Sequence, residues 1–164
     1  MTDDYFGLLE DGKGINITSE KVDIGIGRFT CTTSEDAKIF VDKTIRYMHN
    51  EDVGVWKNTI CMLGDNGDNN EHMIDAENVV KQINDVSGKN LGIKKLYWDA
   101  YPQTMTATGV SFPQVSLMVK EQMKKGAIMF NYSGHGSPDQ ISHSKILFTD
   151  DFREPSVGLP IWVF

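Results

Sequence analysis

The chain has 164 residues, of which 40% are hydrophobic, and carries a formal net charge of -7. This length and apolar content fit one α/β domain with a core. The negative charge disfavours a nucleic-acid partner, because neutralising phosphates requires a basic face. No apolar run reaches the roughly 18 residues of a membrane span, and two cysteines do not make a disulfide framework.

The first predicted pair of elements is a strand followed by a helix. Residues 22–29 alternate apolar residues with small or polar ones, as a strand does. Thr32, Thr33 and Ser34 are N-cap candidates, and Glu35 and Asp36 add acids to a first turn. The helix is expected to run to about residue 48 with one apolar face.

The middle of the chain repeats this alternation. Residues 59–63 form a short apolar run that predicts a buried strand, and a polar loop follows it. A helix is predicted from about residue 71 to 86, and a strand over 94–98 that ends at Asp99.

The last third adds a helix that starts at Pro113 and continues to Lys125, because proline favours the first helical turn. A strand over 127–132 follows, and two shorter strands are predicted at 145–148 and 160–164. Strands separated by long helices imply right-handed crossovers and therefore a mostly parallel sheet.

Three polar loops directly follow predicted strands, at residues 64–72, 99–103 and 133–142. In an open parallel sheet, ligands bind at the carboxyl ends of the strands. The loops therefore share one rim, which collects the candidate functional residues Asp65, Asp68, His72, Asp99 and His135.

The sharpest local signal is Gly134-His135-Gly136. Glycines beside a histidine permit positive φ and close approach of a substrate, and backbone N–H groups in such a turn can stabilise an oxyanion. The imidazole is suited to proton transfer near neutral pH. A histidine hydrogen-bonded in a purely structural turn explains the tripeptide equally well.

The other candidate groups have simpler interpretations. The loop from Asp65 to His72 is rich in oxygen ligands, so calcium is conceivable, but its spacing does not match an EF-hand and a solvated acidic loop is favoured. Cys61 lies inside an apolar strand and is expected in the core, and neither it nor Cys31 is expected to be a nucleophile. His49 and His143 lack a partner pattern and are assigned to the surface.

Several blocks along the chain together resemble the gingipain-type cysteine peptidases. They are Asp4–Gly7, Asp23–Phe29, Val41–Tyr47, Cys61–Asp68 and Asn131–Ser137. The resemblance implies a caspase-like, three-layer α/β/α sandwich with a mostly parallel sheet. It also implies that residues 1–164 are part of a peptidase catalytic domain, incomplete at both ends.

The resemblance assigns roles residue by residue. It implies that His135 is the catalytic histidine, that Asp65 is the acid assisting it, and that Gly134 and Gly136 shape the turn with its oxyanion donors. A second family acid would fall near His72, where this sequence departs from the pattern. The family's nucleophile is a cysteine after the next core strand, here 159–164, so it is expected beyond Phe164, and this chain alone is expected to be inactive.

A narrower resemblance is to the sortase and signal peptidase of the type IX secretion system, carried by Asp99–Gln103 and Gly158–Val163. It implies cleavage of the C-terminal sorting signal of secreted cargo by acyl transfer. It also implies a location on the extracellular face of the outer membrane or secretion. No cofactor is implied as a requirement, and a structural calcium ion is compatible with the family.

Two other functions stay open. The first alternative to the peptidase is a non-catalytic copy of the domain that serves as a binding or scaffold module. The third hypothesis is a metal-dependent hydrolase built on Asp65, Asp68, His72 and His135.

Overall fold

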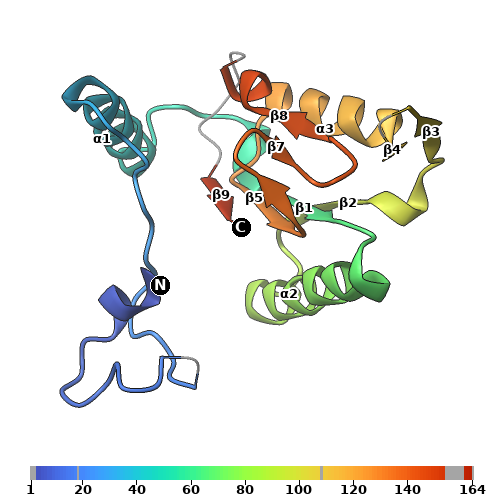
Figure 1. The fold of residues 1–164 in the computed structure, drawn as a ribbon. Helices are drawn as coiled ribbons and strands as arrows, with labels where there is room; N and C mark the ends of the chain where they lie inside the picture. The colour runs from blue at the N-terminus through green and yellow to red at the C-terminus, as the bar shows by residue number, and fades with distance from the viewer. Residues whose placement is uncertain (1–2, 18, 108, 154–160, 164) are drawn as a thin grey trace. The chain divides into compact units, whose positions relative to one another are not determined.

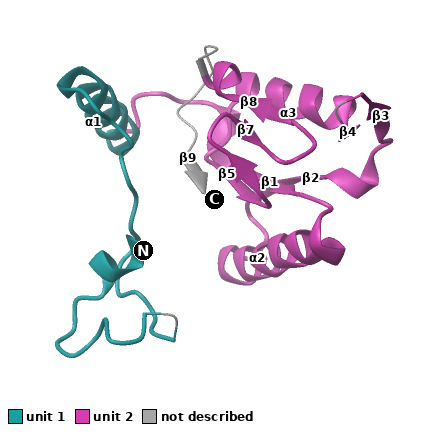
Figure 2. Ribbon diagram, viewed as in Figure 1, with its two compact units in different colours: residues 1–49 teal, residues 50–164 magenta. Residues whose placement is uncertain are grey.

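The computed structural model describes residues 3–17, 19–107, 109–153 and 161–163. The chain forms two compact units, residues 1–49 and residues 50–164, and each is described by itself (Figure 2). The expectation that residues 1–164 are one catalytic domain stays a prediction.

The first unit contains a short 3-10 helix, η1 (Asp3–Gly7), and the helix α1 (Ser34–Met48). The predicted N-cap is confirmed, because the Thr33 side chain accepts a hydrogen bond from the backbone N–H of Asp36. Phe29 stacks on Phe40 of α1 with the ring centroids 5.1 Å apart.

The strand predicted over residues 22–29 is wrong, because this segment has no strand conformation. Its large apolar side chains, Val22, Ile24, Ile26 and Phe29, are 38% to 49% exposed. A strand is stable only when a neighbour completes its hydrogen-bond ladder. The described part of the first unit contains no other strand, so the alternating pattern has no partner there.

The second unit is built on a four-stranded parallel sheet with the order β2-β1-β5-β9 (Figure 1). The strands are β1 (Thr59–Gly64), β2 (Gly92–Tyr97), β5 (Met129–Ser133) and β9 (Ile161–Val163). The predicted parallel sheet is therefore confirmed. Several boundaries differ from those predicted: β2 starts at Gly92 and ends before Trp98, which begins a 3-10 helix, η4 (Trp98–Ala100), and β5 starts at Met129. The ends of the last predicted strand lie outside the described residues.

Two helices cover the opposite faces of this sheet, α2 (Glu71–Ser87) on one and α3 (Pro113–Lys125) on the other (Figure 1). Both were predicted. Pro113 occupies the first turn of α3, and Gly88 ends α2 in a left-handed conformation at φ 61°. The second unit is thus a three-layer α/β/α sandwich, as expected.

Strand β1 is buried on both faces because its side chains alternate between the two helix layers. Ile60 and Met62 pack in one cluster with Ala76 and Val80 of α2. The opposite cluster contains Cys61 and Leu63 of β1 together with side chains of α3, Val115 and Val119. The continuous apolar run in the sequence reflects this double burial.

The remaining elements are short and were mostly not predicted. They are η2 (Val55–Asn58), η3 (Asp68–Asn70), the hairpin β3 (Thr104–Thr106) and β4 (Gly109–Ser111), η5 (Thr149–Arg153), and a three-stranded antiparallel sheet of β6 (Gly136–Ser137), β7 (Gln140–Ile141) and β8 (Leu147–Phe148). The strand expected over 145–148 is confirmed only for its second half. Across the described residues, no helix combines the length and apolarity that crossing a membrane requires.

Burial gives Cys61 a testable chemical property. Desolvation raises the pKa of its thiol to about 12, although the nearby charge of Lys94 lowers it. The thiolate is the reactive form, so in a Cys31→Ser variant we expect no labelling of the folded protein by a thiol reagent at pH 8. Unfolding in urea should expose the thiol and allow full labelling.

The control is a Cys61→Ala variant, which keeps the partly exposed Cys31 and should react without denaturant. Rapid labelling of folded Cys31→Ser protein would contradict the burial of Cys61.

Candidate functional site

The order of the strands places two loops side by side at the carboxyl edge of the sheet. The chain leaves β1 through α2 to β2 on one side, then returns through α3 to β5 on the other side of β1. Connections that depart in opposite directions from neighbouring strands open a crevice at their carboxyl ends. In the pairing of β1 with β5, Gly64 lies opposite Ser133, so the loops that follow them begin at the same level.

The loop after β1 turns back on itself before α2 begins. Asp68, Asn69 and Asn70 have φ values of 49°, 54° and 68°. Asp and Asn are the non-glycine residues that adopt this left-handed region most readily. The turn brings the Asp68 carboxylate to His72 in the first turn of α2, with 3.2 Å between Oδ2 and Nε2.

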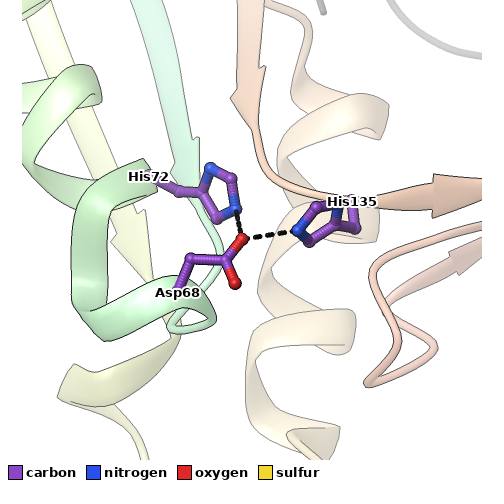
Figure 3. A group of neighbouring side chains, drawn as sticks. All are labelled: Asp68, His72 and His135. Atoms are coloured by element: carbon purple, nitrogen blue, oxygen red, sulfur yellow. Dashed lines mark hydrogen bonds and ion pairs between the residues drawn. The ribbon is translucent and has the colours of Figure 1, made fainter.

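The loop after β5 brings a second imidazole to the same oxygen (Figure 3). His135 Nε2 lies 2.6 Å from Asp68 Oδ2, and the rings of His72 and His135 meet edge to face with centroids 5.0 Å apart. The side chains of Asp68 and His135 are about half exposed, whereas His72 is 18% exposed. Of the predicted rim, the structure thus unites Asp68, His72 and His135.

The hydrogen bond from His135 holds the pKa of the Asp68 carboxyl below its usual value, and a weaker bond from His72 acts in the same direction. The carboxylate therefore stays ionised at neutral pH. An ionised carboxylate only accepts hydrogen bonds, so both Nε2 atoms carry a proton. In its neutral form His135 then has an unprotonated Nδ1, which can take up a proton.

Asp65 is not the partner of His135 and lies in a buried network instead. The carboxylate is 5% exposed and accepts hydrogen bonds from the Ser142 hydroxyl at 2.7 Å and the Gly67 N–H at 3.2 Å. Ser142 in turn accepts a 3.2 Å hydrogen bond from the indole N–H of Trp98. The resemblance implied that Asp65 assists His135, whereas the acid that contacts His135 is Asp68.

The same network holds the backbone of His135. Its carbonyl accepts the Tyr132 hydroxyl at 2.6 Å and the Ser142 N–H at 2.8 Å. Gly134 allows this closeness, because a Cβ there would lie 2.3 Å from the Tyr132 hydroxyl oxygen. Gly136 has a different part, since it pairs with Ile141 as the first residue of β6.

Two further rim residues complete the comparison with the sequence. Asp99 lies exposed in η4 and is not a member of the group formed by Asp68, His72 and His135. His143 is also exposed, but its ring centroid is 5.5 Å from that of His135, a neighbour that the sequence did not predict. Nothing in the sequence pattern signals this contact, because it depends on the reversal between β6 and β7 and on the left-handed Ser142 at φ 67°.

A pocket of about 470 Å³ lies beside the His72 imidazole and the two glycines that flank His135. It is lined by His72, Tyr132, Ser133, Gly134, Gly136, Ser137, Gln140 and Ile141. Its polar lining comes mainly from the loop that carries His135. The pocket and the proton-carrying histidine therefore occupy the same part of the rim.

The donor atoms of Asp68, His72 and His135 all lie within 4.8 Å of one another, so these three side chains could hold a metal ion. The sequence favours a solvated acidic loop over a calcium site here, and that stays a prediction. Asp65, the first acid of that loop, already has protein donors on both carboxylate oxygens.

Removing the Ser142 hydroxyl tests the buried network. In Ser142→Ala, Asp65 loses its shortest donor and Trp98 its acceptor, which should cost about 1–3 kcal/mol of unfolding free energy. Urea denaturation measures the loss. Ser137→Ala, an exposed serine on β6, is the matched control and should change stability by less than about 0.5 kcal/mol. Equal stability of both variants would contradict a structural role for Ser142.

Comparison with known proteins adds the family. The model of peptidase family C25 matches residues 1–164. Among solved structures, the chain is similar to the Arg-specific cysteine proteinase gingipain R (RgpB), with 24% identity, 76% of this chain and 27% of that chain covered, and a TM-score of 0.47. It is also similar to the complex of the Porphyromonas gingivalis RgpB pro- and mature domains, with 23% identity, 76% and 28% coverage, and a TM-score of 0.46.

The chain thus spans little more than a quarter of the length of the solved chains that it matches. No curated protein matches the sequence significantly. Because the family model extends over the entire sequence, the chain belongs to peptidase family C25.

Proposed function

We propose that this chain supplies the general base of a cysteine peptidase, and that His135 is that base. Membership of peptidase family C25 supports the reaction class. The observation that carries the assignment of the residue is the 2.6 Å hydrogen bond between His135 Nε2 and Asp68 at the carboxyl edge of the sheet. It leaves Nδ1 of the neutral ring as the proton acceptor.

In the proposed reaction, Nδ1 of His135 takes the proton of a cysteine thiol, and the sulfur forms a bond to the carbonyl carbon of a peptide. Backbone N–H groups around Gly136 are the proposed donors to the oxyanion. The tetrahedral intermediate then breaks its C–N bond, and the imidazolium returns the proton to the leaving amine. Water or another amine releases the acyl group from sulfur by the same steps in reverse.

The nucleophile is a cysteine other than Cys61. Cys61 faces the α3 side of the sheet, and its buried thiol holds its proton at neutral pH. Because the chain spans little more than a quarter of the solved chains that it matches, we propose that another part of the whole protein supplies the nucleophile. The whole enzyme, not this chain by itself, is the proposed catalyst.

Asp68 is a positioning residue in this proposal. It fixes which nitrogen of His135 carries the proton, and its negative charge stabilises the imidazolium that forms when Nδ1 is protonated. Asp65 acts one step further away, because it anchors the loop through Ser142, whose N–H holds the His135 carbonyl.

A finer proposal is that the substrate is the C-terminal sorting signal of a secreted protein, cleaved on the outer face of the outer membrane. It rests on the sequence likeness of Asp99–Gln103 and Gly158–Val163 to the type IX sortase. A cargo peptide incubated with an added amine should then yield the amide product. If only the free acid forms at every amine concentration, the enzyme is a hydrolase and the proposed transfer to an amine is wrong.

The proposed base is tested by substitution in the full-length natural protein. His135→Ala should lower kcat/KM for thiol-dependent cleavage by about 10²–10⁴-fold, the contribution of a general base. Asp68→Asn should lower it by about 10–100-fold, less than for a buried triad acid because Asp68 is half exposed. The measurement is cleavage of a peptide library under reducing conditions.

The matched control is Asp85→Asn, which removes one exposed carboxylate from α2 and should leave kcat/KM unchanged. Full activity of His135→Ala would contradict the proposal. An inactive full-length wild-type protein would favour the non-catalytic copy.

A further inference from the structure

We propose that Asp68, His72 and His135 form a binding site for a divalent transition-metal ion of the zinc type. The site goes beyond the proposed proton transfer, in which His72 has no part. Two imidazole nitrogens and one carboxylate oxygen converge there from two loops, and all three donor atoms lie within 4.8 Å of one another (Figure 3).

The distances between the donor atoms suit such an ion after small movements. In a tetrahedral zinc site with bonds of about 2.0–2.2 Å, ligand atoms lie about 3.3–3.6 Å apart. Asp68 Oδ2 is already 3.2 Å from His72 Nε2, and 2.6 Å from His135 Nε2. The shorter gap can widen, because the side chains of Asp68 and His135 are half exposed to solvent.

The backbone prepares two of these ligands for the ion. The left-handed conformations at Asp68, Asn69 and Asn70 return the chain so that the carboxylate faces the imidazole four residues later. The third ligand has a fixed backbone as well, since the His135 carbonyl accepts two hydrogen bonds, from Tyr132 and Ser142. Little ordering of the main chain is therefore required when the ion binds.

The chemistry of the ligands selects the class of ion. Two imidazoles and a carboxylate suit zinc and other first-row transition metals, whereas calcium and magnesium prefer sets made of oxygen atoms. Three protein ligands leave a fourth position for water or a substrate group, as in an open zinc site. The exposure of the cluster gives the ion direct access from solvent.

Binding of the ion and the proposed proton transfer exclude each other. The metal would take the Nε2 lone pairs of His72 and His135, so the one proton of each neutral ring would sit on Nδ1 instead of Nε2. Nδ1 of His135 would then have no lone pair with which to accept the proton of a thiol. His135 would lose its hydrogen bond to Asp68 and carry a positive ion instead. This consequence rests on the proposed function, whereas the binding site itself does not.

Titration of the metal-free purified protein with ZnCl₂ by isothermal calorimetry tests the site. We expect one ion per chain, and a weakening of at least about tenfold in both His72→Gln and Asp68→Asn. The matched control, His49→Gln, removes a histidine from the first unit and should bind like the wild type. Circular dichroism checks that each variant is folded, and CaCl₂ at the same concentration should give no heat at this site.

The proposal is overturned if the wild-type protein binds no zinc. It is equally overturned if His49→Gln weakens binding as much as His72→Gln, or if His72→Gln and Asp68→Asn both bind like the wild type. These outcomes do not depend on peptidase activity, so they are distinguishable from failure of the proposed function. In an active full-length enzyme, zinc should inhibit wild-type cleavage more strongly than cleavage by any active His72→Gln variant.

Discussion

The parallel pairing of β1 with β5 is the constraint on which the site depends. It places Gly64 opposite Ser133, and the ladder continues one residue further, since the Asp65 N–H donates to the Ser133 carbonyl at 3.0 Å. The elements α2, β2 and α3 separate these two loops in the sequence, yet both loops start at the same level of the sheet. A shift of this register by one residue would turn every side chain of β5 to the opposite helix layer and separate the loops.

At this edge of the sheet the buried polar groups fix the backbone, and the exposed polar groups stay accessible to solvent. The buried set of Asp65, Ser142 and Trp98 has its hydrogen bonds satisfied within the protein and fixes the backbone around His135. A buried set of this kind is costly to disturb, and so it specifies one arrangement of the loops. Asp68 and His135 remain accessible, which a group that exchanges protons or binds ions requires.

The sequence predicts the sandwich well, because the periodicity of β1, α2 and α3 reports burial directly. It fails at residues 22–29, where alternation is present but no second strand in the described part of that unit pairs with it. The sequence also predicts that both loops lie at the carboxyl edge of the sheet, but it does not predict which acid contacts His135. Asp65 and Asp68 share one loop, and only the left-handed turn that starts at Asp68 decides that Asp68 turns outward to the imidazoles.

The central claim is that Asp68 fixes the protonation of His135, and long-range ¹H–¹⁵N NMR of the imidazole nitrogens tests it most directly. A His135→Gln variant assigns the signals. In metal-free protein with the imidazole in its neutral form, the claim predicts that His135 carries its proton on Nε2, and that Asp68→Asn shifts this tautomer equilibrium. A neutral His135 protonated on Nδ1, or one whose signals are unchanged in Asp68→Asn, would contradict it.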